Sequence, residues 1–264
     1  MHQKWISWVR IAASGAIFAA ALLAGSDFAA AAPAPIRIAF VGDSMADGLW
    51  GSMFRRLGKD KCLAERLKLI RHGKNGTGLT RLDQFNWPTE VATLAEVPGV
   101  DLFVGSFGIN DRQPIVEEDR KQRIPFPGPA FDARYKALVE DLVRNAIAKG
   151  GSILVLGLPV MLDSDANADA IAKNQLFAAA VSAVGSPLAV YAPPWTSGQT
   201  PDEYKPFLPN AKNAMIQVRA TDGVHFTTAG YDMVLDTFYP AILASLKQRG
   251  RDLESECPSQ LGAR

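Results

Sequence analysis

The chain has 264 residues, 48% of them hydrophobic and 21% charged, with a formal net charge of +1 at pH 7. This balance gives no basic surface for nucleic acid or for an anionic membrane, so we expect neither partner. The two cysteines are far apart and have no neighbouring histidine, so we expect no metal site.

The first residues are typical of a secretory signal peptide. Lys4 and Arg10 provide a positive start, residues 11–23 form an apolar core, and residues 28–32 offer small-residue cleavage sites. We therefore expect residues 1–31 to be removed on export, leaving no stable membrane insertion. The alternative, an uncleaved anchor, is disfavoured because the apolar run is short for a membrane span.

The remaining chain is predicted to form one domain over residues 32–249, followed by a polar, mobile tail over 250–264. Cys62 and Cys257 leave two alternatives open. They could form a disulfide that ties this tail to the first helix region, or they could be two unpaired thiols.

Short apolar segments alternate with amphipathic helices along this domain. Strands are predicted at residues 36–41, 67–71, 101–107, 152–158 and 188–191, and the clearest helices lie at 131–146, 165–184 and 228–248. The alternation predicts an α/β fold, with a five-stranded parallel sheet covered by helices on both faces. Two longer connections, 112–129 and 192–221, are expected to shape specificity.

Ser44 is the strongest candidate nucleophile. It ends the run Gly42-Asp43-Ser44 between the first strand and a helix-like segment, so its N–H lies near a helix amino terminus. A serine needs a base to accept its proton. His225 can take this role, with Asp222 three residues earlier orienting the imidazole.

A second polar turn, Gly108-Ile109-Asn110-Asp111, follows the third predicted strand. Because sites in parallel sheets form at the carboxyl ends of strands, we expect this turn to lie beside Ser44. Asp43 and Asp111 are expected to hydrogen-bond the turns that aim Ser44 and Asn110. His72 has no partner at an informative spacing and is expected to be structural.

Together the sequence resembles the SGNH (GDSL-type) hydrolases, in particular a predicted periplasmic bacterial branch of unassigned substrate. The matching blocks are Gly42-Asp43-Ser44, Asn75-Gly76-Thr77-Gly78-Leu79, Gly108-Ile109-Asn110-Asp111 and Asp222-Gly223-Val224-His225. The resemblance implies a flavodoxin-like three-layer α/β/α sandwich, no cofactor, and a catalytic triad of Ser44, Asp222 and His225. It also implies an oxyanion hole from the Ser44 N–H, the Asn110 amide and a glycine N–H, where Gly78 is favoured over Gly76.

The resemblance implies removal of O-acyl groups in the periplasm, from an acylated carbohydrate or a small ester. Two alternatives remain: an O-acyltransferase with the same triad, and a glycan-binding protein without activity. Arg81 and Arg112 flank the oxyanion-hole segments. Either could bind an anionic group of the substrate, or they could form salt bridges, such as Arg81 with Asp83 or Asp111. The oligomeric state stays open.

Overall fold

A computed structural model describes residues 34–96, 99–196 and 203–258. The expected signal peptide and residues 259–264 lie outside these described residues. The chain from Ala34 to Arg264 forms one compact unit, to which the following description applies.

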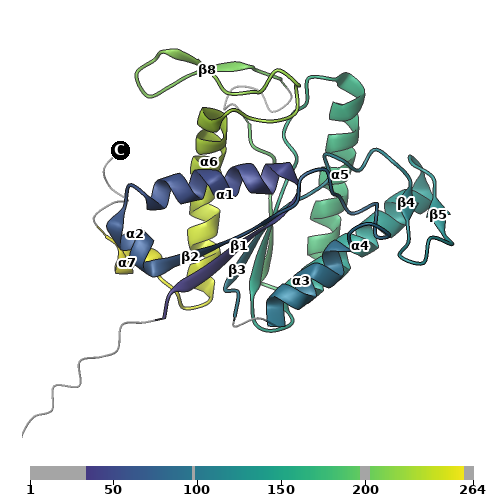
Figure 1. Cartoon of the computed structure of the whole chain (residues 1–264), viewed down its shortest axis with the longest axis horizontal. Helices are drawn as coiled ribbons and strands as arrows, with labels where there is room; N and C mark the ends of the chain where they lie inside the picture. Colours follow the sequence, from purple (N-terminus) through teal and green to yellow (C-terminus); the bar gives the residue numbers. More distant parts are fainter. Residues whose placement is uncertain (1–33, 97–98, 197–202, 259–264) are drawn as a thin grey trace, which may run out of the picture. The chain divides into compact units, whose positions relative to one another are not determined.

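A parallel five-stranded sheet forms the centre of this unit, in the order β2-β1-β3-β6-β7 (Figure 1). All five predicted strands are present, with ends shifted by one or two residues. Their bounds are Ile36–Gly42 (β1), Leu67–Gly73 (β2), Leu102–Ser106 (β3), Ser152–Leu156 (β6) and Ala189–Ala192 (β7). The predicted α/β class and five-stranded parallel sheet are therefore confirmed.

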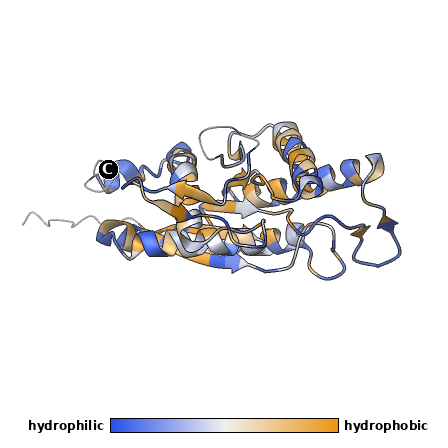
Figure 2. Cartoon of the chain, turned by 90° about the horizontal axis from the view of Figure 1, so that it is seen from above, coloured by the Kyte–Doolittle hydropathy of each residue, from blue (hydrophilic) through white to orange (hydrophobic). Residues whose placement is uncertain are grey.

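Helices cover both faces of the sheet. One face carries α1 (Ser44–Leu57) and α6 (Thr228–Gln248), together with the short α2 (Lys61–Arg66) and α7 (Leu253–Glu256). The other carries α3 (Trp87–Glu96), α4 (Pro129–Ile147) and α5 (Ser164–Val184). Figure 2 shows the hydrophobic strands between these two layers of helices.

Alternate residues of each strand supply the two hydrophobic cores. Ile38 and Phe40 of β1 point into the core beneath α1 and α6, whereas Ala39 and Val41 point into the core beneath α3, α4 and α5. All four are fully buried, and a side chain such as Phe40 contributes roughly 1.5–3 kcal/mol by burial. This two-sided burial explains why the strands are continuous apolar runs.

Polar caps fix the helix starts next to the sheet. The Asp43 carboxylate accepts from the Met45 N–H and begins α1, and the Thr227 hydroxyl accepts from the Gly230 N–H and begins α6. Since both caps stand next to residues of the proposed triad, they fix the directions in which the chain leaves Ser44 and His225.

Each long connection contains a short hairpin that was not predicted. The first holds β4 (Ile115–Val116) and β5 (Arg123–Ile124), and the second holds β8 (Phe207–Pro209) and β9 (Met215–Gln217). In Figure 1 the β4–β5 hairpin lies beyond one end of α4, and β8 lies beyond the amino-terminal end of α6. Strands of two or three residues are too short to show the alternation by which longer strands are recognised.

The prediction of a mobile tail from residue 250 is wrong for the residues up to 258. Residues 253–256 form α7, Leu253 is buried in the core beneath α6, and Cys257 is joined to Cys62 by a disulfide. The disulfide alternative is therefore the one present. A polar composition concealed this packing, because only two residues of the segment enter the core.

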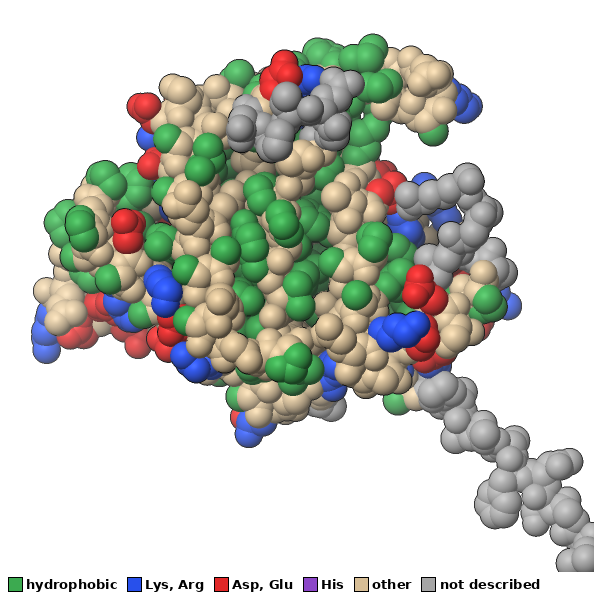
Figure 3. All heavy atoms as spheres, turned by 180° about the vertical axis from the view of Figure 1, so that it is seen from behind, with side chains coloured by type: hydrophobic (Ala, Val, Ile, Leu, Met, Phe, Trp, Pro, Cys, Tyr) green, Lys and Arg blue, Asp and Glu red, His purple; other side chains and the backbone are tan. Residues whose placement is uncertain are grey.

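Figure 3 shows one face on which hydrophobic side chains occupy much of the centre and charged side chains of both signs gather near the margins. Within the ranges that the structure describes, no helix has the length and apolar composition of a membrane span.

Candidate active site

Ser44, His225 and Asp222 meet at the carboxyl edge of the sheet. The Ser44 Oγ lies 2.6 Å from the His225 Nε2, and the His225 Nδ1 lies 2.7 Å from the Asp222 Oδ2. Ser44 is the first residue of α1, directly after β1, whereas the other two residues lie in the turn before α6. The structure thus brings together the three predicted side chains across 181 residues of sequence in nucleophile–base–carboxylate order.

The surroundings of Asp222 lower its pKa and so keep its carboxylate ionised. Burial acts to raise its pKa, but three hydrogen bonds outweigh this effect: from the N–H groups of Val224 and His225 and from the His225 ring. Together they lower the pKa of Asp222 to about 2. An ionised Asp222 holds the proton on Nδ1 of His225, which leaves Nε2 free to accept the Ser44 proton.

The turn that presents Ser44 depends on Gly42. Its φ is +131°, and a Cβ there would lie 1.8 Å from the Ser106 carbonyl oxygen on β3. Only glycine therefore lets β1 and β3 approach here. β1 and β3 are also the two strands at which the order of the sheet reverses, the position where ligands bind in open α/β sheets.

The Asp43 side chain holds the Ser44 turn through hydrogen bonds to backbone N–H groups. Its fully buried carboxylate accepts from the N–H of Met45 at 2.9 Å and from that of Ile109 at 3.4 Å. Burial above all raises its pKa to about 8, and the neighbouring Asp111 acts in the same direction. Asp43 thus connects the serine turn to the turn after β3, as predicted.

Asp111 is also fully buried, and it connects the turn at residues 108–111 to the segment at residues 75–80. It accepts hydrogen bonds from the N–H groups of Leu79 and Thr80, from the Thr80 hydroxyl and from the Tyr135 hydroxyl. The Asn110 side-chain Nδ2 donates to the Thr77 carbonyl at 2.8 Å. One N–H of the Asn110 amide is thereby used, and the other remains for a ligand.

The two candidate glycines lie in different surroundings. Gly78 is buried, and a Cβ there would lie 1.9 Å from the Asp111 Oδ1. Gly76 is exposed, has φ of +75°, and has no atom within 4 Å of its Cβ position. Among the described residues, none accepts a hydrogen bond from the Gly78 N–H. Only Gly78 is therefore packed against the Asp111 network that also positions Asn110.

Sequence reasoning missed Arg219, a buried residue that holds the histidine turn. Its guanidinium donates to the carbonyls of Val160, Val224 and His225 and lies over the ring of Phe226. Only 2% of the residue is exposed. One signal was available: a single arginine in an apolar stretch, six residues before the histidine. That signal alone does not distinguish a buried arginine from an exposed one.

Arg81 and Arg112 both form ion pairs. Arg81 makes two hydrogen bonds to the Asp83 carboxylate, at 2.8 and 2.9 Å, which is the salt bridge given above as the alternative. Arg112 lies 2.5 Å from Asp169 and 3.5 Å from Asp163. Neither guanidinium is thus held toward Ser44 by the contacts it makes.

A small apolar pocket of about 30 Å³ lies next to the proposed triad. Ile109 and Val224, the chain neighbours of Asn110 and His225, line it together with apolar residues of the following segments. Two charged residues also line it, Lys173 and the predicted substrate-binding residue Arg112. A cavity of this size has room for a small substituent.

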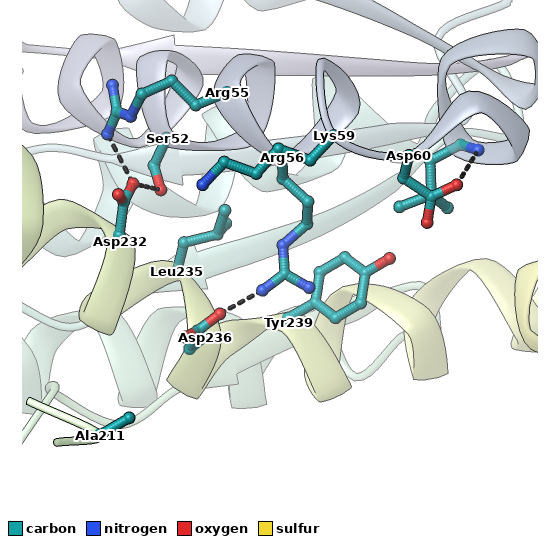
Figure 4. A pocket seen from close by; sticks show the side chains of 11 residues that line it. Ser52, Arg55, Arg56, Lys59, Asp60, Ala211, Asp232, Leu235, Asp236 and Tyr239 are labelled. Atoms are coloured by element: carbon teal, nitrogen blue, oxygen red, sulfur yellow. Dashed lines mark hydrogen bonds and ion pairs between the residues drawn. The ribbon is translucent and has the colours of Figure 1, made fainter. Parts of the chain in front are cut away.

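A larger pocket, of about 560 Å³, lies between α1 and α6 and contains none of the triad residues (Figure 4). Four of its charged side chains are paired across the two helices, Arg55 with Asp232 and Arg56 with Asp236. The Arg56 guanidinium also lies over the Tyr239 ring. These contacts join α1 to α6, so we assign the pocket a structural role. In the described ranges, no three His, Cys, Asp or Glu side chains are grouped to hold a metal ion.

Comparison with known proteins identifies both a sequence family and a fold. Residues 37–241 match the model of a family described as "Protein of unknown function (DUF459)". A carbohydrate esterase family 3 structure from Talaromyces cellulolyticus is 13% identical with a TM-score of 0.52, covering 81% of this chain and 99% of that chain. No curated protein sequence matches the chain.

Two bacterial structures give similar values. A carbohydrate acetylesterase family member from Sinorhizobium meliloti is 18% identical with a TM-score of 0.50, covering 80% of this chain and 99% of that chain. A proposed SGNH hydrolase from Slackia heliotrinireducens is 16% identical with a TM-score of 0.50, covering 79% and 100%. At these identities the likeness shows the fold alone, and the predicted SGNH hydrolase fold is confirmed.

Proposed function

This chain belongs to the DUF459 family and has the SGNH hydrolase fold, and from this premise we propose that it is an exported serine esterase. The reaction is removal of an O-acyl group from an envelope glycan or a small ester. The single observation that carries the proposal is the chain of hydrogen bonds from the Ser44 Oγ through His225 to Asp222, at 2.6 and 2.7 Å.

The geometry supports the following first half-reaction. The His225 Nε2 accepts the Ser44 proton while the Ser44 Oγ attacks the ester carbonyl carbon. The oxyanion that forms is stabilised by N–H groups of Ser44, Gly78 and the Asn110 amide. His225 then returns the proton to the leaving alcohol, and the acyl group stays on Ser44.

Exposure favours water as the second reactant over a sugar hydroxyl. The side chains of His225 and Asp222 are 34% and 50% exposed, so water can reach the base that must activate it. Transfer to another alcohol would instead need a site that excludes water. Hydrolysis of the acyl-Ser44 intermediate is therefore our proposal, and O-acyl transfer is the alternative.

Two further observations support a short acyl group and an exported protein. The 30 Å³ pocket lined by Ile109 and Val224 has room for a group about the size of a methyl, the substituent of an acetyl ester. The Cys62–Cys257 disulfide is typical of proteins of oxidising compartments such as the periplasm. Carbohydrate esterases among the structures of the same fold are compatible with an acylated glycan as substrate.

The test is p-nitrophenyl acetate turnover by the purified protein and two serine variants. Ser44→Ala should lower kcat by about 10³-fold or more, because the nucleophile is lost. Ser52→Ala is the matched control: this serine lies on the same helix but bonds to Asp232, away from His225. It should retain turnover.

Covalent labelling by a fluorophosphonate gives the second readout. The wild type and Ser52→Ala should be labelled at Ser44, since labelling needs an activated serine. If no variant shows Ser44-dependent turnover or labelling, the esterase proposal fails and a glycan-binding function takes its place.

A further inference from the structure

A pocket of about 360 Å³ beside the proposed oxyanion hole is lined by three arginines and one aspartate. These are Arg81, Arg120, Arg123 and Asp83, with Gln113 and Val116 between them. The formal charge of this arginine pocket is +2, from three positive groups and one negative group. The whole chain has a net charge of only +1, so two excess positive charges in one pocket favour an anionic ligand.

Strand pairing brings the arginines of this pocket to one surface. Arg81 is bridged to Val116, and Val116 is paired with Arg123 in the β4–β5 hairpin. Residues directly opposite one another on neighbouring strands project to the same face, and the strands are about 4.8 Å apart. Arg81 and Arg123 therefore flank Val116 on one face, with Arg120 in the turn of the same hairpin.

The three guanidinium groups differ in their remaining capacity to bind. Asp83 accepts two hydrogen bonds from Arg81, and Arg120 lies 3.6 Å from Oδ2, one of the two oxygens that Arg81 already contacts. Arg123 is exposed, and in the described part of the chain no carboxylate lies within ion-pair distance of it. Arg123, and then Arg120, can thus bind a further anion while Asp83 holds Arg81 in place.

Two residues that line the arginine pocket follow closely, in the chain, the two segments proposed to form the oxyanion hole. Arg81 is three residues after Gly78, and Gln113 is three residues after Asn110, to whose carbonyl the Gln113 side chain donates at 2.8 Å. Three residues of extended chain span at most about 11 Å. The pocket therefore lies within reach of a substrate whose carbonyl occupies the oxyanion hole.

We propose that Arg123 and Arg120 bind an anionic group of the substrate while its reacting carbonyl occupies the oxyanion hole. This inference rests on the proposed esterase function and adds a substrate class to it: esters that carry a carboxylate or a phosphate. The anion can belong to the acyl part or to the alcohol part of the ester, and the two sources are separated by the choice of probe.

The test compares matched anionic and neutral esters. For the acyl side, the mono-p-nitrophenyl ester of adipate is compared with p-nitrophenyl hexanoate. For the alcohol side, acetylated methyl galacturonide is compared with acetylated methyl galactoside. In at least one pair, Arg123→Gln should lower the anionic-to-neutral ratio of kcat/KM about fivefold or more, and Arg123→Glu should lower it further.

Lys121→Gln is the matched control. It removes one positive charge from the same hairpin, two residues from Arg123, at an exposed side chain that does not line the pocket. It should leave the ratio unchanged, so a general loss of positive charge is separated from loss of this site. If Arg123→Gln also leaves both ratios unchanged while Ser44-dependent turnover persists, the inference is overturned and the esterase proposal stands.

A direct binding measurement keeps the two proposals distinct. Binding of free adipate and of inorganic phosphate is followed by calorimetry on Ser44→Ala, which needs no turnover. In the Ser44→Ala background, a second substitution Arg123→Gln should weaken binding of at least one anion about fivefold or more. Lys121→Gln in the same background should leave binding unchanged. Equal binding by all three proteins would overturn the anion site, whatever the outcome for activity.

Discussion

At the scale of single residues, the proposed site is built on buried carboxylates that never contact the substrate. Asp43 and Asp111 are both fully buried, and each accepts backbone N–H groups from the turns that carry the reacting groups. Burying a carboxylate is costly unless hydrogen bonds compensate for the lost hydration. The cost is tolerated here because the same bonds fix Ser44 and Asn110 in place.

Asp43 should make stability depend on pH. Its pKa is raised by burial from 3.8 to about 8, so the native state keeps a proton that the unfolded chain has released. Stability from this group is thus fully present below about pH 4 and falls as the pH rises toward 8, by up to about 1.4 kcal/mol per unit. Asp43→Asn removes the titration. Its stability relative to wild type, measured by urea unfolding, should rise between pH 5 and pH 8.

The control for this pH series is Asp119→Asn, the same substitution at an exposed carboxylate in the β4–β5 turn. Its stability relative to wild type should stay constant over the same pH interval. A constant difference for Asp43→Asn as well would contradict the assigned titration.

At the scale of elements, the turn before α6 is held by a short antiparallel bridge between Arg219 and Phe226 and, in addition, by the Arg219 side chain. Arg219 donates to three carbonyls, two of them in the turn that ends in His225. Guanidinium donors form a planar fork that an ammonium group does not reproduce. Arg219 therefore serves as a positioning residue for His225, the proposed base.

Arg219→Lys should separate positioning from folding. The variant keeps the charge but loses the fork, so His225 shifts and the rate of fluorophosphonate labelling at Ser44 should fall about ten- to a hundredfold. Labelling is measured at a temperature where circular dichroism shows an intact fold. Arg56→Lys, in the ion pair between α1 and α6, is the control: it should lower the melting temperature without slowing the labelling of the folded protein. Equal labelling rates in both variants would assign Arg219 a purely structural role.

At the scale of the whole molecule, the disulfide and the proposed site lie at opposite ends of the fold. Cys62 lies in α2, just before β2 begins, and Cys257 follows α7 after the far end of α6. The 21 residues of α6 extend roughly 30 Å from the His225 turn. The bridge closes a loop with a sequence separation of 195 without contacting the triad.

Replacing both cysteines by serine should therefore reduce the free energy of unfolding and leave the turnover rate unchanged. The expected loss is about 2–5 kcal/mol in the free energy of unfolding, because a long loop in the unfolded chain is released. At 25 °C the kcat for p-nitrophenyl acetate should stay within about twofold of wild type, since additivity holds for distant sites. A large fall in kcat with unchanged stability would show that the bridge acts on the site instead.

The sequence alone determined the sheet, its parallel direction and the three residues proposed to react. Continuous apolar strands alternating with helices leave few topologies, and with three histidines in the chain the choice of base is narrow. The resemblance to SGNH hydrolases, carried by four short blocks, added the layer order that the structure confirms. These features depend on local pattern, which a sequence displays directly.

Only the tertiary structure decided which polar residues are paired, buried or free. Arg112 and Arg123 are both arginines in the same connecting segment, yet the fold places Arg112 against Asp169 of α5 and leaves Arg123 exposed. Arg219 drew no prediction and the tail around Leu253 was predicted to be mobile, but both residues are buried. The physical reason is common to all: burial and ion pairing depend on what packs against a side chain, and that neighbour is set by long-range contacts.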